Sequence, residues 1–299
     1  MISIVMSTFN GSEYLIEQLD SIKNQTVQAD EVIIADDCSS DNTLEMVTDY
    51  VIKHSLNWIV YKNAEHYGWK KSFKEALSLA NGDYIFPADQ DDIWKLDKLE
   101  LMTKAMDELP DCKLLCGNYF KIYYDNKKND ITKCTYHITK KSFTNKWGYI
   151  QKPGCVFCCR KELVKEMCEC WVDGYSHDSL LWQLAIAQEA LFLLDYNVIY
   201  YRRHDHNATP KYKRNRNNKL MLLELFINNL KAFISYVSEK NIYIKNLDSI
   251  MRFFEFQNKR YELIKNRKLH IFFWLFHHRS YYVRGILSMG VDIKCALTK

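Results

Sequence analysis

The segment GDYIFPADQDDIW, residues 82–94, passes from a short apolar run to a cluster of carboxylates within a few positions. The run YIFPA at 84–88 predicts a buried strand, and Asp89, Asp91 and Asp92 follow it directly. Like charges this close together disfavour one another unless a cation lies among them. Three interpretations are open at this point: a metal ion, a lysine cage, or solvent alone.

The chain before this segment alternates between strand and helix patterns. Short apolar runs predict strands at 2–7, 31–36 and 58–62. Such alternation implies an α/β fold with a parallel sheet and right-handed crossovers. Ligands of these sheets bind beyond the carboxyl ends of the strands. The loops at those ends are all polar: 8–11, 36–41, 63–71 and 89–92. The sequence therefore predicts a ligand site at this edge of the sheet.

Charge divides the 299-residue chain into two regions, although the net charge is only +4. Residues 211–299 hold 18 Lys and Arg against 6 Asp and Glu, a balance of +12. Residues 1–210 hold 23 against 31, a balance of −8. An acidic body with a basic tail suggests that the tail meets an anionic surface. No recognition motif for nucleic acid accompanies the basic residues, so a nucleic-acid partner is not expected.

The basic tail has helical patterns at 220–238 and 249–264, followed by a mixture of basic and aromatic residues at 266–288. Two interpretations stay open: an interfacial helix with Trp274 at the headgroup level, and a helical subdomain or oligomer interface. No stretch approaches 18 apolar residues, so no transmembrane helix is expected. Without a signal-peptide pattern, a cytoplasmic location is expected, with peripheral attachment to the inner membrane face as an alternative.

The ten cysteines, without a secretory signal, predict reduced thiols. Five fall close together: Cys155, Cys158, Cys159, Cys168 and Cys170. Their spacing is irregular for zinc, and CVFCC is typical of a buried strand in which cysteine acts as a small hydrophobe. The buried interpretation is therefore favoured.

Asp89 and Asp91 flank one residue at a predicted strand end, an arrangement that can hold Mg²⁺ or Mn²⁺ through oxygen ligands. Such a pair is weak evidence alone, because acidic turns are common. Its context is stronger. Four segments together resemble the family 2 glycosyltransferases of the GT-A fold: VMSTFNGSEYLIEQLDSIKNQT, VIIADDCSSDNT, GDYIFPADQDDIW and HDSLLW. The segments DQDDIW, HD and YRRHDHN (201–207) are most similar to the bacterial rhamnosyltransferase-like branch.

This resemblance covers residues 2–210 and implies a Rossmann-like, mostly parallel central sheet flanked by helices. A GT-A catalytic domain at 1–210 and a helical region at 211–299 are expected. The implied activity is an inverting, metal-dependent transfer of a sugar from a nucleoside-diphosphate donor, either dTDP-rhamnose or a UDP-hexose. The implied acceptor is a saccharide, lipid-linked, in cell-wall or surface-polysaccharide synthesis.

The resemblance also implies roles for individual residues. The residues expected at the donor nucleotide are Thr8, Asn10, Asp36, Gly68, Lys71 and Asp89, with Lys70 beside them. Asp36 is expected to accept the N3–H of the base. Asp91 and His204 are expected to hold Mg²⁺ or Mn²⁺, and Asp178 to be the catalytic base. Gly154 and His177 are expected on the acceptor side.

Two departures and two rival functions bear on this reading. His177 stands where many members carry Glu, and its role is open between catalysis and a hydrogen-bonded helix start. The Q-x-x-R-W motif of processive synthases is missing, which argues against a processive enzyme. A Rossmann dehydrogenase is disfavoured because STFNGSEY holds one glycine. A non-catalytic nucleotide-sugar-binding or scaffolding protein stays the alternative.

Overall fold

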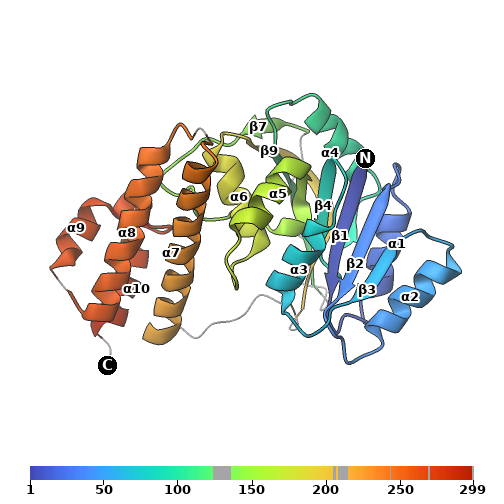
Figure 1. Cartoon of the computed structure of the whole chain (residues 1–299), viewed down its shortest axis with the longest axis horizontal. Helices are drawn as coiled ribbons and strands as arrows, with labels where there is room; N and C mark the ends of the chain where they lie inside the picture. The colour runs from blue at the N-terminus through green and yellow to red at the C-terminus, as the bar shows by residue number, and fades with distance from the viewer. Residues whose placement is uncertain (124–135, 205–206, 208–214, 243, 269, 298–299) are drawn as a thin grey trace.

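The structure, a computed structural model, describes residues 1–123, 136–204, 207, 215–242, 244–268 and 270–297. In this part of the chain, nine strands form one sheet in the order β3-β2-β1-β4-β8-β6-β9-β5, with β7 paired to β9. Helices flank the sheet, and a group of C-terminal helices lies beside it at the left of Figure 1. The expected mixed α/β architecture with a mostly parallel sheet is confirmed.

The first half of the sheet is parallel. Its strands are β1 (Ile2–Thr8), β2 (Glu31–Asp36), β3 (Ile59–Lys62) and β4 (Tyr84–Ala88). Three helices connect them: α1 (Leu15–Lys23), α2 (Thr43–Lys53) and α3 (Trp69–Ser78). Every residue of β1 is buried, as expected for a parallel strand covered on both faces. The four strands lie where the apolar runs predict them, within one residue.

The second half of the sheet is mixed. Its strands are β5 (Ile93–Trp94), β6 (Leu114–Tyr123), β7 (Ile138–Lys140), β8 (Phe157–Arg160) and β9 (Leu191–Arg203). Its helices are α4 (Lys98–Asp107), the 3₁₀ turn η1 (Gly154–Val156), α5 (Lys161–Cys170) and α6 (His177–Ala187). β8 runs antiparallel between β4 and β6, whereas β9 is parallel to β6.

The apolar runs LFLLD (191–195) and VIYYRRH (198–204) predict two separate strands, whereas the structure has the single strand β9. The polar residues in its middle do not end the strand, because the pairing with β6 shifts register near Asn118. There the Asn118 side chain donates a hydrogen bond to Asp195 at 2.6 Å. The polar run DNKKND (125–130), between two β-like runs of sequence, predicts a hairpin or surface loop, and it lies outside the described residues.

The C-terminal region is helical, as expected. It comprises α7 (Arg216–Glu239), α8 (Leu247–Asn266), α9 (Ile271–His277), the 3₁₀ turn η2 (Arg279–Tyr281) and α10 (Ile286–Leu297). The ring of Trp147 lies 5.9 Å from that of Phe233 and 5.6 Å from that of Phe253. These helices therefore share buried contacts with the preceding part of the chain. A domain boundary at 210 stays a prediction, because 208–214 lies outside the described residues.

α7 differs from one sequence expectation. By length and composition alone it could cross a membrane, although only 28% of its most apolar 18-residue window is buried. Core helices pass the same test, and α7 lies against α5 and α8.

The described cysteines are all free. Cys155, Cys158 and Cys159 are buried where η1 leads into β8. Burial raises the pKa of each of these thiols well above its ordinary range. A protonated thiol is a poor metal ligand, so the interpretation as buried hydrophobes is supported.

Candidate active site

A cavity of about 440 Å³ opens at the carboxyl ends of β1 and β4. Six of the residues singled out from the sequence line it: Gly68, Asp89, Asp91, Gly154, His177 and Asp178. They come from four separate segments of the chain. The cavity therefore lies at the edge of the sheet where the polar loops predict a ligand site.

Asp91 and His204 meet at this cavity, although 113 positions separate them in the sequence. The Oδ2 atom of Asp91 lies 2.8 Å from His204 Nε2 and accepts a hydrogen bond from Asn207 at 2.9 Å. A carboxylate oxygen and an imidazole nitrogen are both ligands that a divalent cation accepts. The residues present at this point therefore fit a metal ion.

The end of β9 is held against the carboxylate cluster by Arg202. Its backbone N–H donates to Asp92 Oδ1 at 3.1 Å, and its Nε donates to the Asp91 carbonyl at 2.9 Å. The ring of Tyr14 lies 4.6 Å from the guanidinium of Arg202 and 4.7 Å from the ring of His204. These contacts fix the direction from which His204 approaches Asp91.

A buried lysine also stands beside the carboxylates. Lys98 is fully buried, donates to the Cys155 carbonyl at 2.8 Å and lies 3.3 Å from the ring centroid of Trp94. Burial lowers the pKa of Lys98 to about 7, whereas burial and the neighbouring Asp91 raise that of Asp89 to about 7. A raised carboxyl pKa beside a lowered ammonium pKa indicates that this one lysine does not fully offset the negative charge of the cluster.

Asp92 adds a third carboxyl group to the cluster, one that is not fully satisfied by hydrogen bonds among the described residues. Its side chain is fully buried, and its Oδ2 atom has no hydrogen-bond partner among the described residues. Burial, followed by the charges of Asp89 and Asp91, raises its pKa well above the ordinary value. Asp89, Asp92 and Cys155 place one ligand atom each within 4.8 Å of one another. Of the three interpretations of the cluster, lysine is present, and the geometry at Asp91 also suits a metal.

Asp178 lies in the first turn of α6 and lines the cavity. Its carboxylate accepts a hydrogen bond from the Ser179 N–H at 2.7 Å and is only partly buried. A carboxylate that lines a ligand cavity can take a proton from a bound hydroxyl group. The arrangement is compatible with the expected role of Asp178 as a base.

His177 precedes Asp178 and is buried. Its ring stacks on Phe73 at 4.4 Å and meets the edge of Trp69 at 6.1 Å. Burial lowers its pKa, and the charge of Asp178 opposes that change. Its Nδ1 atom is buried without a hydrogen-bond partner in the described part of the chain. The hydrogen-bonded helix start considered from the sequence is therefore not formed through this atom.

Gly154 approaches both residues so closely that a side chain there would force them to shift. A Cβ atom there would lie 3.1 Å from Asp178 Cβ and 3.2 Å from His177 Nε2. Glycine at this position lets η1 pack directly against the start of α6.

We expect the Gly154→Ala variant to transfer sugar more slowly than the wild type, by less than the roughly 10²-fold that a displacement of about 1 Å costs, because the added methyl group would push Asp178 by only a fraction of that distance. Nucleotide affinity, measured by calorimetry, should change little. The matched control is Gly290→Ala in α10, where a Cβ meets no atom within 4 Å. Equal rates for both variants would show that the close approach of Gly154 does not position Asp178.

Three residues expected at the nucleotide frame the cavity without lining it. Thr8 and Asp36 are buried, and the Thr8 hydroxyl donates to Asp36 at 3.2 Å. Asp36 also accepts from the Ser39 N–H at 3.0 Å. Asn10 accepts from the Ser40 N–H at 2.8 Å. These bonds join the loops that follow β1 and β2, and direct contact with the nucleotide stays a prediction.

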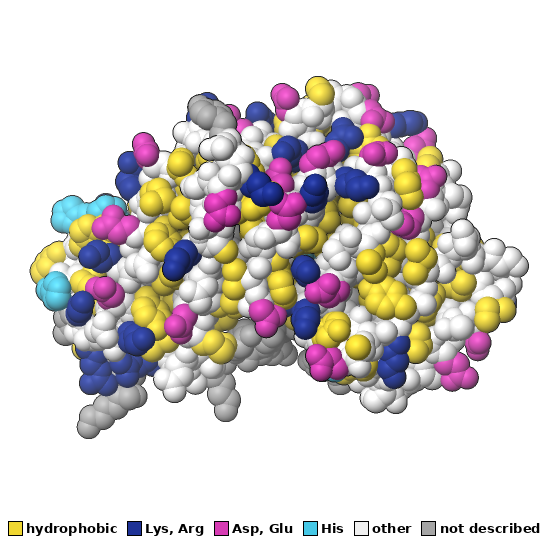
Figure 2. Space-filling model, in the orientation of Figure 1, with side chains coloured by type: hydrophobic (Ala, Val, Ile, Leu, Met, Phe, Trp, Pro, Cys, Tyr) yellow, Lys and Arg dark blue, Asp and Glu magenta, His cyan; other side chains and the backbone are white. Residues whose placement is uncertain are grey.

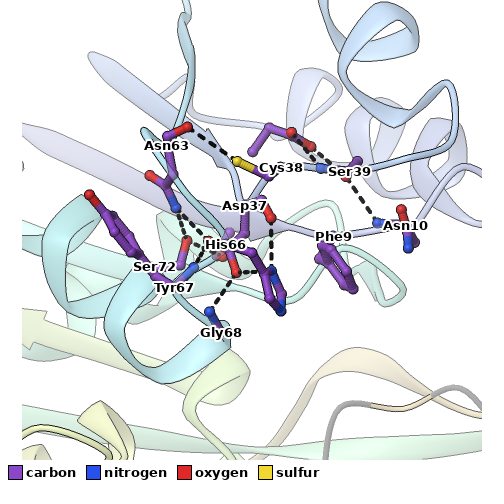
Figure 3. Close-up of polar contacts among 12 residues, drawn as sticks. Phe9, Asn10, Asp37, Cys38, Ser39, Asn63, His66, Tyr67, Gly68 and Ser72 are labelled. Atoms are coloured by element: carbon purple, nitrogen blue, oxygen red, sulfur yellow. Dashed lines mark hydrogen bonds and ion pairs between the residues drawn. The ribbon is translucent and has the colours of Figure 1, made fainter.

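The neighbouring Asp37 organises the loop that follows β3 (Figure 3). This buried carboxylate accepts hydrogen bonds from the Asn63 amide, the Tyr67 N–H and the Gly68 N–H, each at 2.8 Å. It also lies 2.9 Å from His66 Nδ1. The loop thereby places His66 and Gly68 at the cavity.

Sequence reasoning missed Phe9 and His66, which line the cavity with their rings 4.3 Å apart. It also missed Gln90, whose amide both accepts from the Phe9 N–H at 2.9 Å and donates to the Phe9 carbonyl at 3.1 Å. Gln90 thus joins the loop after β1 to the loop after β4. Strand alternation could have identified Phe9, since side chains alternate between the two faces of a strand. Ser7 and Phe9 line the cavity, whereas Thr8 is buried and does not line it.

Neither expected lysine lines the cavity. Lys70 donates to the Gly174 carbonyl at 2.6 Å, and Lys71 lies 4.2 Å from the ring centroid of Tyr67. The pKa of Lys70 is lowered, because the effect of burial exceeds the opposing effect of the Asp178 charge. A phosphate contact for Lys71 stays a prediction.

Comparison with known proteins adds to this geometry. Residues 3–165 match the sequence profile of glycosyl transferase family 2. The chain is 28% identical to the dTDP-rhamnosyl transferase RfbG of Shigella flexneri over 285 residues, which cover 87% of this chain and 96% of that protein.

Two solved structures share the fold. TarS of S. aureus in complex with UDP-GlcNAc gives a TM-score of 0.64 at 14% identity and covers 99% of this chain and 89% of that one. The mannosyltransferase PcManGT of Pyrobaculum calidifontis, in complex with GDP-Man and Mn²⁺, gives 0.54 at 14% identity and covers 98% and 73%. The family profile spans more than half of the sequence, and this chain belongs to glycosyltransferase family 2.

Proposed function

We propose that this glycosyltransferase moves a sugar, with inversion, from a nucleoside-diphosphate donor to a saccharide acceptor, and that it uses Mg²⁺ or Mn²⁺. The observation that carries the proposal is that Asp178 and the paired Asp91 and His204 come together at one cavity. dTDP-rhamnose is the first candidate donor, because the relative RfbG is named a dTDP-rhamnosyl transferase and the alignment covers 96% of its length. A UDP-hexose is the second, from the UDP-GlcNAc complex of TarS.

Asp91 and His204 would hold the cation, which would neutralise the charge that develops on the leaving diphosphate. Asp89 would lie near the same end of the donor. Asp178 would take the proton of the acceptor hydroxyl as that oxygen attacks the anomeric carbon. Gly154 and His177, which contact Asp178, would shape the acceptor side.

The acceptor that we propose is a lipid-linked saccharide in cell-wall or surface-polysaccharide synthesis. The enzyme would then work on the cytoplasmic side, at the inner face of the cell membrane. The relationship to RfbG supports this assignment.

Asp91→Asn tests the metal part of the proposal. We expect Mn²⁺-dependent binding of dTDP and UDP to weaken at least about tenfold, because a neutral amide replaces a charged ligand oxygen. Stability without metal should be unchanged or slightly higher, since one of several like charges is removed. Calorimetry with and without Mn²⁺ and thermal melting are the measurements.

Asp49→Asn is the matched control, because Asp49 is exposed on α2 and the change removes the same charge. Wild-type affinity of the Asp91→Asn protein in Mn²⁺ would contradict the ligand role. Nucleotide binding by the wild-type protein that ignores Mn²⁺ would contradict metal dependence itself.

A further inference from the structure

A second cavity, of about 540 Å³, lies in the C-terminal region where η2 leads into α10. Its walls include three permanent cations, Lys146, Arg279 and Arg284, and the apolar side chains of Ile286 and Leu287. None of the described residues that line it is Asp or Glu. The cavity wall therefore combines basic and apolar side chains.

The three cations lack the ion pairs that neutralise their neighbours. Within the described residues, Lys146, Arg279 and Arg284 form no salt bridge. By contrast, Lys268 pairs with Glu262 at 3.1 Å and Arg260 pairs with Asp292 at 2.6 Å. A concave surface with unbalanced positive charge attracts an anionic partner.

Large apolar side chains stand exposed in the cavity and in the segments next to its lining residues: Ile286 and Leu287 line it, and Phe273, Phe276 and Val283 lie nearby in the sequence. The exposed fractions are 71% for Phe273, 39% for Phe276, 48% for Val283, 59% for Ile286 and 76% for Leu287. Single exposed apolar residues are normal, but such a group within a short segment marks an interaction surface. We call the three cations and these five residues the basic–apolar surface.

The fold holds this surface in place. Ile271 and Leu275 bury the opposite side of α9, so Phe273 and Phe276 project from an anchored helix. Gly285 adopts a φ of 51°, a left-handed conformation that starts α10 with Ile286 and Leu287 exposed.

A contact between distant segments completes the surface. Asn145 donates to the Ser280 hydroxyl at 3.0 Å, which brings Lys146 to the same cavity. Figure 2 shows Lys and Arg side chains gathered at the lower left, over the end of the molecule that α8 and α10 form.

The sequence expectation for this region centres on Trp274. Trp274 is half-buried, with its ring stacked on His278 at 3.8 Å and on Phe256 at 6.5 Å, so its place at the headgroup level stays a prediction. The side chains of the basic–apolar surface are more exposed than Trp274.

We propose that the basic–apolar surface docks on a bilayer that contains anionic phospholipid. Lipid phosphates would occupy the cavity against the three cations, while Phe273, Ile286 and Leu287 enter the boundary of the acyl chains. A lipid surface presents anionic groups directly beside hydrocarbon, which matches the combination of basic and exposed apolar side chains here. The docking is separate from sugar transfer and does not depend on the proposed donor or metal.

Co-sedimentation of the full chain with vesicles tests the proposal. Vesicles of phosphatidylcholine with phosphatidylglycerol should bind the protein at low salt, and those of phosphatidylcholine alone much less. Replacing Lys146, Arg279 and Arg284 with Gln should weaken binding about a hundredfold, because each basic residue near such a surface contributes about fivefold. Added salt should weaken wild-type binding, since it screens the charges. The double change Phe273→Ser and Leu287→Ser should remove the binding that survives high salt.

The matched control replaces Lys53, Lys62 and Lys231, which are exposed elsewhere and form no ion pair in the described chain, with Gln. A control that loses as much binding as the cavity variant would overturn the proposal, since net charge alone would then explain binding. Failure of the wild-type protein to bind anionic vesicles would also overturn it.

Light scattering measures the molar mass of the protein in solution and thereby tests whether a second copy of the chain, rather than a bilayer, covers the basic–apolar surface. A dimer that the cavity variant disrupts, with vesicle binding unchanged, would assign the surface to self-association and overturn membrane docking. Calorimetry of dTDP with Mn²⁺ on the same variants should match the wild type. The outcome for docking is thereby separated from the outcome for the proposed transferase reaction.

Discussion

The Asp178→Asn variant is expected to transfer sugar 10²- to 10⁴-fold more slowly than the wild type, the usual range for the loss of a general base. The amide keeps the shape of the side chain and can still accept from Ser179, but it cannot take a proton. The donor should bind as before, because the change spares Asp91 and His204. The defect should therefore fall on kcat, whereas Asp91→Asn should act on metal-dependent binding.

The rate is measured as release of dTDP or UDP from the donor in the presence of a lipid-linked saccharide acceptor. Asp173→Asn is the matched control, because Asp173 is exposed a few positions before the helix that carries Asp178. An unchanged rate at saturating substrate would show that another residue acts as the base.

The largest loss of stability is expected from Asp292→Asn. Asp292 is fully buried in α10 and accepts from Arg260 at 2.6 and 3.2 Å and from the Tyr282 hydroxyl at 2.9 Å. Lys219 lies 3.2 Å from the same carboxylate. Removing this partner leaves the buried Arg260 charge uncompensated, which costs about 3–5 kcal/mol of unfolding free energy. Urea denaturation is the measurement.

The cost should depend on pH. Burial alone would raise the pKa of Asp292, but the Arg260 guanidinium and the other donors lower it below the ordinary value. A carboxylate whose folded pKa is lowered stabilises the protein fully above its unfolded pKa, about 3.9, and loses that contribution as the pH falls through the folded value. The difference between wild type and variant should therefore be complete near pH 7 and shrink below about pH 4.

Asp248→Asn is the control, since Asp248 is exposed near the start of α8. A loss below about 1 kcal/mol for Asp292→Asn, the level of a surface ion pair, would mean that water replaces the carboxylate.

Much of the sheet is predictable because its central strands are buried on both faces. Such strands leave continuous apolar runs, and β2 and β4 begin and end at the residues that the runs predict. The antiparallel insertion of β8 between β4 and β6 is not predictable in this way, since a pairing partner leaves no local pattern. β5 is too short, at two residues, to show any period.

The site divides along similar lines. Asp91, His204 and Asp178 could be chosen because motifs record which residues recur together, and the fold brings them to one cavity. Lys98 could not be foreseen, because its burial against Trp94 depends on how α4 packs. A motif also says little about side-chain direction. It does not reveal that the Asp36 carboxylate accepts from Thr8, and the contact of Asp36 with the base stays a prediction.

The buried amide pair on α6 and α7 limits how this enzyme could be recombined with its relatives. Gln183, in the helix that begins with His177 and Asp178, accepts a hydrogen bond from Asn229 of α7 at 2.9 Å and donates to the Gly148 carbonyl at 2.8 Å. A chimaera joined near residue 210 would take these two residues from different parent proteins and could leave buried polar atoms without hydrogen-bond partners. A chimaera of two family members should therefore fold well only when α6 and α7 come from the same parent protein.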